Sequence, residues 1–227
     1  MAIICRDVGF LFLQAPHTGS SAIGRALRKQ LACTRLVHDY ARDEAGRIIM
    51  RRKHQTLSQL LATSTISAEE RSNLFVAAGV RNPFDLVVTE YARGIDLDAP
   101  DDTEERKHPD AWLPEPSPED FERFVRRRYA AGLARRATRR RRRGLPSDYT
   151  EGVDFIIRFE RMQADLDEAL RSVGVLTRVM IPVVNVTPAR KGRHYREYYT
   201  AEARYIIERV WAERLGRWGY AFEANSG

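Results

Sequence analysis

The stretch from Gly9 to Leu27 constrains the fold most, because it predicts a strand, a tight turn and a helix in direct succession. Its opening aromatic and aliphatic run is typical of a short buried strand, and Pro16 ends that run since proline has no N–H for a strand ladder. Gly19, Ser20 and Ser21 stand where the helix begins. The free N–H groups and positive dipole end there suit a phosphate or sulfate, and the two hydroxyls add donors.

The composition indicates a globular chain that favours anionic partners. Its 227 residues fit a single domain over residues 1–227, and the 43% hydrophobic and 30% charged contents are those of a folded protein with a real core. The formal net charge is +7 and the pI about 9.7. This balance favours nucleotides, phosphorylated or sulfated substrates, nucleic acid or a membrane surface, without choosing among them.

The sequence also argues against a membrane span and a metal centre. No apolar run approaches the roughly 20 residues of a spanning helix, and the N-terminus lacks the charged and apolar regions of a signal peptide, which predicts a cytoplasmic protein. Cys5 and Cys33 are too few for a disulfide framework or a zinc site. The five histidines show no ligand spacing. We therefore expect no bound metal.

Strand-like and helix-like segments alternate along the chain. Leu74–Val80 is apolar throughout, as in a parallel strand covered on both faces, and Val153–Glu160 predicts another strand. Helical patterns begin near residues 22, 56, 67, 83, 117, 162 and 200. Residues 34–40 could form a second strand, and 179–184 is a further apolar run. The alternation predicts an α/β protein with a three-layer, P-loop-like fold, in which helices flank a central, mainly parallel sheet.

The turn at Gly19 resembles two different phosphate-binding loop motifs. Gly19 and Gly24 have the spacing of a nucleoside-triphosphate loop, but Arg25 and Ala26 follow in place of the lysine and the hydroxyl residue. A small-molecule kinase is therefore an alternative that lacks its phosphate lysine and its magnesium ligand. An ordinary strand–helix turn with a serine cap is the plainer interpretation.

The second motif comes from a family resemblance. Pro16–Ser21 reads Pro-His-Thr-Gly-Ser-Ser, which resembles the Pro-Lys-Thr-Gly-Ser/Thr-Ser/Thr loop of sulfotransferases that use 3′-phosphoadenosine 5′-phosphosulfate, with His17 at the lysine position. Arg81–Pro83 matches their Arg-Asn-Pro after a central strand, and Thr89 stands where a serine is expected. In the family this arginine and serine bind the 3′-phosphate. An arginine at a strand end and a hydroxyl two helical turns later could share one phosphate.

Two later segments add to the resemblance. Arg158–Met162 looks like the family's Arg-Tyr/Phe-Glu-x-Leu segment, in which Glu160 is mainly structural. The C-terminal block looks like the closing segment of carbohydrate-type, or Golgi-type, sulfotransferases, and it comprises Asn185, Thr187, the Arg190-Lys191-Gly192 turn, Tyr198–Thr200 and Trp218–Phe222. Arg190 and Lys191 could then close over the 3′-phosphate, although a solvated basic turn explains them as well.

The resemblance implies transfer of a sulfuryl group from 3′-phosphoadenosine 5′-phosphosulfate to a hydroxyl or amine of a small-molecule or carbohydrate-type acceptor. The product nucleotide is adenosine 3′,5′-bisphosphate, and no metal is needed. The implied cofactor-binding residues are His17, Thr18, Gly19, Ser20, Ser21, Arg81, Thr89, Arg190 and Lys191.

Two histidines are the implied catalytic residues. His54 follows Arg52 and Lys53, a setting like that of the family's base, and a neutral imidazole suits proton removal near pH 7. A surface histidine at the start of a helix is the alternative. His17 would steady the leaving oxygen only when protonated, or more weakly as a neutral donor. Imidazole has an ordinary pKa of about 6.5, which a nearby anion raises, so turnover should fall above neutral pH.

The middle of the chain matches nothing in the family. Residues 94–150 lack periodicity, which predicts a lid or an acceptor-side insertion, and they contain the arginine run 135–143. Such runs are usually solvated, and no aromatic interleaving or recognition motif accompanies this one, so nucleic-acid binding is not favoured. An anionic acceptor such as an acidic glycan is another use. A non-catalytic basic module that binds nucleic acid or a partner is the third function considered.

Overall fold

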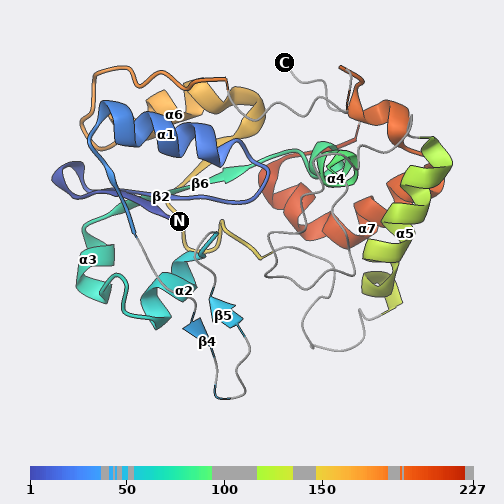
Figure 1. Ribbon diagram of the computed structural model, residues 1–227, viewed down its shortest axis with the longest axis horizontal. Helices are drawn as coiled ribbons and strands as arrows, with labels where there is room; N and C mark the ends of the chain where they lie inside the picture. Colours follow the sequence, from blue (N-terminus) through green and yellow to red (C-terminus); the bar gives the residue numbers. More distant parts are fainter. Residues whose placement is uncertain are drawn as a thin grey trace. The chain divides into compact units, whose positions relative to one another are not determined.

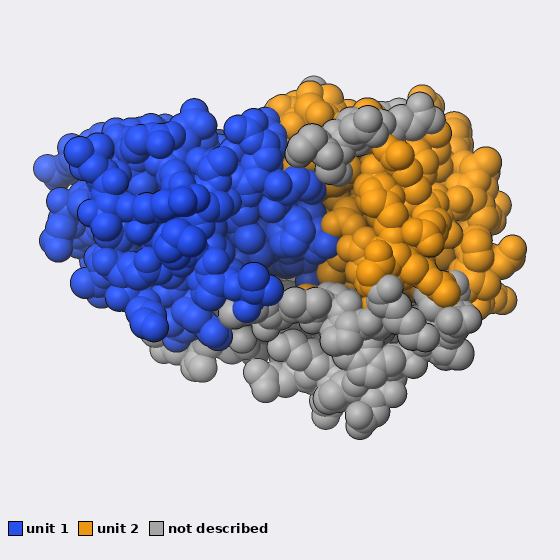
Figure 2. Space-filling view, turned by 90° about the horizontal axis from the view of Figure 1, so that it is seen from above, with its two compact units in different colours: residues 1–81, 147–185 blue, residues 82–146, 186–227 orange. Residues whose placement is uncertain are grey.

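The computed structural model describes residues 1–36, 41–42, 44, 48–50, 54–93, 117–134, 147–183, 190 and 192–222. The chain divides into two compact units, residues 1–81 with 147–185 and residues 82–146 with 186–227 (Figure 2). Lys191, the arginine run 135–143 and most of the expected insertion 94–150 lie outside the described residues. The prediction of a single domain stays a prediction.

The first unit is built around a mixed sheet. Its described strands are β1 (Ile3–Cys5), β2 (Phe10–Leu13), β3 (Thr34–Arg35), β4 (Ala41–Arg42), β5 (Ile48–Met50), β6 (Phe75–Val80) and β7 (Phe155–Arg158). Five of them form one sheet in the order β3-β1-β2-β6-β7, and β4 pairs with β5 separately. The pairs β2–β6 and β6–β7 are parallel, whereas β1 is antiparallel to both β2 and β3.

The α/β class with a helix-flanked sheet is thus confirmed, but the sheet is mixed because a hairpin precedes the predicted first strand. β1 and β2 are joined by a 3₁₀ turn, Arg6–Val8, and by Gly9 in the left-handed region at φ 65°. A Cβ on Gly9 would lie 2.9 Å from the carbonyl oxygen of Asn73. Glycine is therefore required here both by the conformation and by the close approach.

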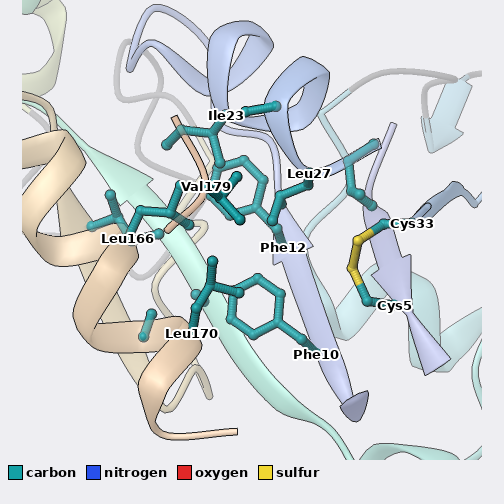
Figure 3. Packing of buried hydrophobic residues seen from close by; sticks show 14 residues of the cluster. Cys5, Phe10, Phe12, Ile23, Leu27, Cys33, Leu166, Leu170 and Val179 are labelled. Carbon is teal, nitrogen blue, oxygen red and sulfur yellow. A yellow bond between two sulfur atoms is a disulfide. The ribbon is translucent and has the colours of Figure 1, made fainter. Parts of the chain in front are cut away.

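Helices cover both faces of this sheet (Figure 1). They are α1 (Ser20–Gln30), α2 (Leu57–Ala62), α3 (Ala68–Ser72) and α6 (Met162–Arg171). Alternate residues of β2 face opposite sides: Phe10 and Phe12 pack with residues of α1 and α6, and Leu11 and Leu13 pack with residues of α2. Figure 3 shows the first of these clusters.

The apolar run at 179–184 does not form a strand over its described residues, 179–183. Two glutamine side chains form hydrogen bonds with its backbone in place of a neighbouring strand. The Met180 N–H donates to Oε1 of Gln30 at 2.9 Å, and the Ile181 N–H donates to Oε1 of Gln163 at 3.0 Å. Both glutamines also donate to carbonyl oxygens of the same run. The segment packs on the sheet unit through Val179, which is fully buried.

The cysteines pair, although two were expected to be too few for a disulfide framework. Cys5, at the end of β1, and Cys33, just after α1, form a disulfide inside the cluster of Figure 3. The bridge closes a loop that contains β2, the turn and α1. Within the described ranges, no helix has the length and apolar character needed to cross a membrane.

The second unit is helical where it is described. It contains α4 (Pro83–Ala92), α5 (Pro118–Ala134), a 3₁₀ turn (Tyr195–Tyr198) and α7 (Ala201–Trp218). The predicted helix start at Pro83 is confirmed, because Asn82 caps α4 and accepts from the Phe84 N–H at 3.0 Å. On α7, Tyr205 lies on the outer face. Its side chain is 51% exposed, and Ile207 lies on the buried face of α7.

A buried charge network lies between two helices of this unit. The Glu90 carboxylate, 4% exposed, accepts from the Tyr129 hydroxyl at 2.8 Å and from Nε of Arg128 at 3.1 Å. Burial raises the pKa of Tyr129 well above its ordinary value, and the negative charge of Glu90 adds to the rise. Glu90 is thus held as an ion pair inside the helical unit.

Candidate functional site

The candidate site is the turn between β2 and α1, here called the Gly19 loop (residues 14–21). Two of its residues adopt left-handed backbone conformations, His17 at φ 60° and Gly19 at φ 71°. The hydroxyls of Thr18 and Ser20 both donate to the Ala15 carbonyl oxygen, at 3.0 and 2.6 Å. These bonds fold the loop back on itself. The hydroxyl hydrogen of Ser20, which the sequence analysis assigned to a ligand, is therefore used within the loop, as is that of Thr18.

The start of α1 retains donors for an anion. Gly19 is the N-cap residue and supplies no side-chain cap. The N–H groups of Ser20 and Ser21 lie in the first turn of the helix, where backbone N–H groups have no acceptor within the helix. Ser21 is exposed, and no acidic side chain lies in the first turn. The positive end of the helix dipole is therefore uncompensated by the helix itself.

Close packing fixes the loop against two neighbouring strands. A Cβ on Gly19 would lie 2.6 Å from Sδ of Met162, and a Cβ on Gly79 would lie 2.7 Å from Oγ1 of Thr18. Gly79 belongs to β6, and Met162 follows β7. The loop thus rests on the carboxyl ends of three parallel strands, the edge at which α/β sheets usually bind ligands.

Arg81 joins the loop from the end of β6. Its side chain donates from Nη1 to the His17 carbonyl oxygen at 3.2 Å, and its guanidinium lies 4.2 Å from the ring centre of Phe159. Arg81 is 8% exposed. A stacked, hydrogen-bonded guanidinium is held in one orientation, so the structure brings this predicted residue to the Gly19 loop. Glu160, beside Phe159, is exposed.

His54 also contacts the loop. Its Nδ1 lies 2.7 Å from the carbonyl oxygen of Gln14. A carbonyl only accepts, so Nδ1 carries the proton, and in the neutral ring Nε2 carries the lone pair. His54 adopts a left-handed conformation at φ 64° and directly precedes the residues that start α2. His54 and His17 therefore belong to one region of the first unit.

Gln14 is a site residue that the sequence analysis missed. Its Nε2 donates to the Ser20 carbonyl oxygen at 2.8 Å, tying the end of β2 to the first turn of α1. A Cβ on Gly24 would lie 2.6 Å from the same Nε2. Gly24 is the second glycine of the nucleoside-triphosphate loop spacing, and its lack of a side chain leaves space for Gln14. The available signal was a polar residue directly after a buried apolar strand.

The remaining predicted residues belong to the second unit. Thr89 is fully buried, and its hydroxyl donates to the Asp85 carbonyl oxygen one turn earlier in α4, at 3.0 Å. Nη1 of Arg190 pairs with Oδ1 of Asp85 at 2.6 Å, and its Nη2 donates to the Arg193 carbonyl oxygen at 3.2 Å. Within this unit both side chains already have polar partners. Lys191 lies outside the described residues.

The part of the chain that the structure describes contains no group of three or more His, Cys, Asp or Glu arranged to hold a metal ion. Comparison of the chain with protein-family models, with curated proteins and with solved structures gave no match. The fold class and the candidate site are therefore described from the structure alone. It is an α/β protein with a mixed sheet, and Arg81 and His54 both contact the loop at the carboxyl end of β2.

Proposed function

We propose that this chain is a sulfotransferase that uses 3′-phosphoadenosine 5′-phosphosulfate, with a three-layer, P-loop-like fold. The observation that carries the proposal is the Arg81 side chain hydrogen-bonded to the Gly19 loop, beside an uncapped helix start. Two segments that the family resemblance assigns to the two ends of the nucleotide thus lie together at one sheet edge, although they are far apart in the sequence. Both features bind anionic oxygens well.

The residues present fit a nucleotide that carries two anionic groups. The N–H groups of Gly19, Ser20 and Ser21 would hold the 5′-phosphosulfate, and Arg81 would hold the 3′-phosphate. When bound, the nucleotide supplies the sulfuryl group that the acceptor receives. Thr89, Arg190 and Lys191 stay sequence-based predictions for the 3′-phosphate, and within the second unit Arg190 pairs with Asp85.

His54 is the proposed base. With its proton on Nδ1, the neutral ring removes the proton of an acceptor hydroxyl or amine through Nε2. His17 is the proposed donor to the leaving oxygen, with its backbone anchored by Arg81. The acceptor is a small molecule or a glycan, and an acidic glycan fits the net charge of +7.

The Cys5–Cys33 disulfide bears on the cellular compartment of the protein. We keep cytoplasmic as the sequence-based prediction, but the Cys5–Cys33 disulfide weighs against it, because the cytosol of most organisms keeps protein thiols reduced.

Calorimetric titration with three ligands separates this proposal from its alternatives. A sulfotransferase binds adenosine 3′,5′-bisphosphate without added metal. A small-molecule kinase prefers ATP with magnesium, and a basic nucleic-acid module binds duplex DNA with a steep salt dependence. If adenosine 3′,5′-bisphosphate gave no heat while either other ligand bound, the sulfotransferase proposal would be wrong. Transfer of labelled sulfate to a panel of hydroxyl, amine and glycan acceptors then identifies the acceptor.

A further inference from the structure

The backbone of His54 is held in a conformation that non-glycine residues seldom adopt. Its φ of 64° lies in the left-handed region, where a side chain with a Cβ is strained. Such strain persists only where surrounding contacts over-determine it, and it often marks a functional position.

Tyr149 makes one of these contacts. Its hydroxyl donates to the His54 carbonyl oxygen at 2.7 Å, and its ring packs against the apolar cluster that includes Leu57 and Leu60. The turn that carries Tyr149 is fixed by Asp148, whose Oδ1 accepts from both the N–H and the hydroxyl of Thr150, at 2.9 and 2.7 Å. The hydroxyl is thus presented to His54 from a rigid support.

On the other side, Nδ1 of His54 donates to the Gln14 carbonyl oxygen. We propose that Tyr149 is a positioning residue for His54. Its hydroxyl holds the left-handed backbone that lets Nδ1 reach Gln14, and so it fixes Nε2 as the basic nitrogen. The catalytic consequence depends on the proposed function, whereas the assignment of the proton to Nδ1 does not.

The test is Tyr149→Phe, which keeps the ring in its apolar contacts and removes only the donor. Nitrogen NMR of the histidine side chains reads the position of the proton directly. Wild-type protein is expected to show His54 protonated at Nδ1 when neutral, and the variant is expected to show a mixture of both tautomers. Tyr205→Phe, at an exposed position on α7, is the matched control and should leave the His54 signals unchanged.

Kinetics give the second measurement. If sulfuryl transfer is established, Tyr149→Phe should lower kcat about fivefold, as loss of one hydrogen bond predicts, while affinity for adenosine 3′,5′-bisphosphate stays unchanged. Wild-type His54 protonated at Nε2, or identical His54 tautomers in wild type and variant, would overturn the inference. If no acceptor is sulfated, the proposed function fails, and the NMR result still decides the role of Tyr149.

Discussion

Nη1 of Arg81 donates to the carbonyl oxygen of His17 across 3.2 Å, so the residue that follows β6 holds the turn that follows β2. Arg81→Lys removes the planar fork and its stacking on Phe159 while keeping the charge. We expect it to weaken binding of adenosine 3′,5′-bisphosphate about tenfold, and Arg81→Ala to weaken it about 100-fold. Calorimetry measures both. Arg171→Lys, at an exposed position of α6, is the control, and equal affinities for Arg81→Lys and Arg171→Lys would remove Arg81 from the site.

Under the proposed function, His17 is expected to make the rate of sulfuryl transfer depend on pH. An imidazole that must be protonated loses its charge as pH rises above its pKa, so the wild-type rate should fall towards pH 9, by up to about tenfold per pH unit. His17→Lys should hold its rate over the same range, because lysine titrates near 10.4. Rates measured from about pH 6 to 9 compare the two proteins. Superimposable profiles would mean that the His17 side chain takes no part.

The Cys5–Cys33 disulfide should stabilise the fold substantially. It joins residues 28 positions apart, and restricting an unfolded loop of that length is worth about 3 to 4 kcal/mol in the chain-entropy model. Denaturant unfolding of wild-type protein and of the Cys5→Ala, Cys33→Ala double variant measures the difference. Adding a reductant should destabilise only the wild type. Equal unfolding free energies for the two proteins under oxidising conditions would show that the bridge contributes nothing.

Four tyrosines of the second unit should titrate late in alkali. Burial raises the pKa of Tyr91 to about 12, raises that of Tyr198, and raises those of Tyr129 and Tyr199 well above the ordinary value. The unfolded chain loses these protons near pH 10, whereas the folded chain keeps them. Their contribution to stability is therefore complete below about pH 10 and is lost as the pH rises towards 12.

Phenolate absorbance and unfolding free energy, both followed against pH, check this prediction. Full ionisation of every tyrosine near pH 10 in the folded protein, or stability that rises between pH 10 and 12, would contradict it.

The sequence predicted those elements whose signals are local. Asn82 and Pro83 mark the start of α4 by capping and by a fixed φ. Thr56 marks the start of α2 by a capping box with Gln59. The strand before the Gly19 loop was evident because apolar residues run between two turn signals. β1 was missed, since three residues without polar alternation carry little periodic information.

The site was predicted in part. Arg81 was placed correctly at a strand end, but its bond to His17 depends on which strands become neighbours. The contacts of His54 with Gln14 and Tyr149 link loops 40 and 95 positions away, and no local pattern encodes such pairs. The side-chain bonds of Ser20 and Thr89 to nearby carbonyl oxygens were likewise invisible, because hydroxyl residues are equally suited to a ligand and to their own backbone.

The central claim is that one doubly anionic nucleotide is held by the Gly19 loop and by Arg81. A crystal structure with adenosine 3′,5′-bisphosphate tests it most directly. We predict one molecule whose 5′-phosphate accepts from the N–H groups of Gly19 to Ser21 and whose 3′-phosphate pairs with Arg81. A nucleotide that leaves either group without a phosphate, or that binds at another surface, would contradict the account.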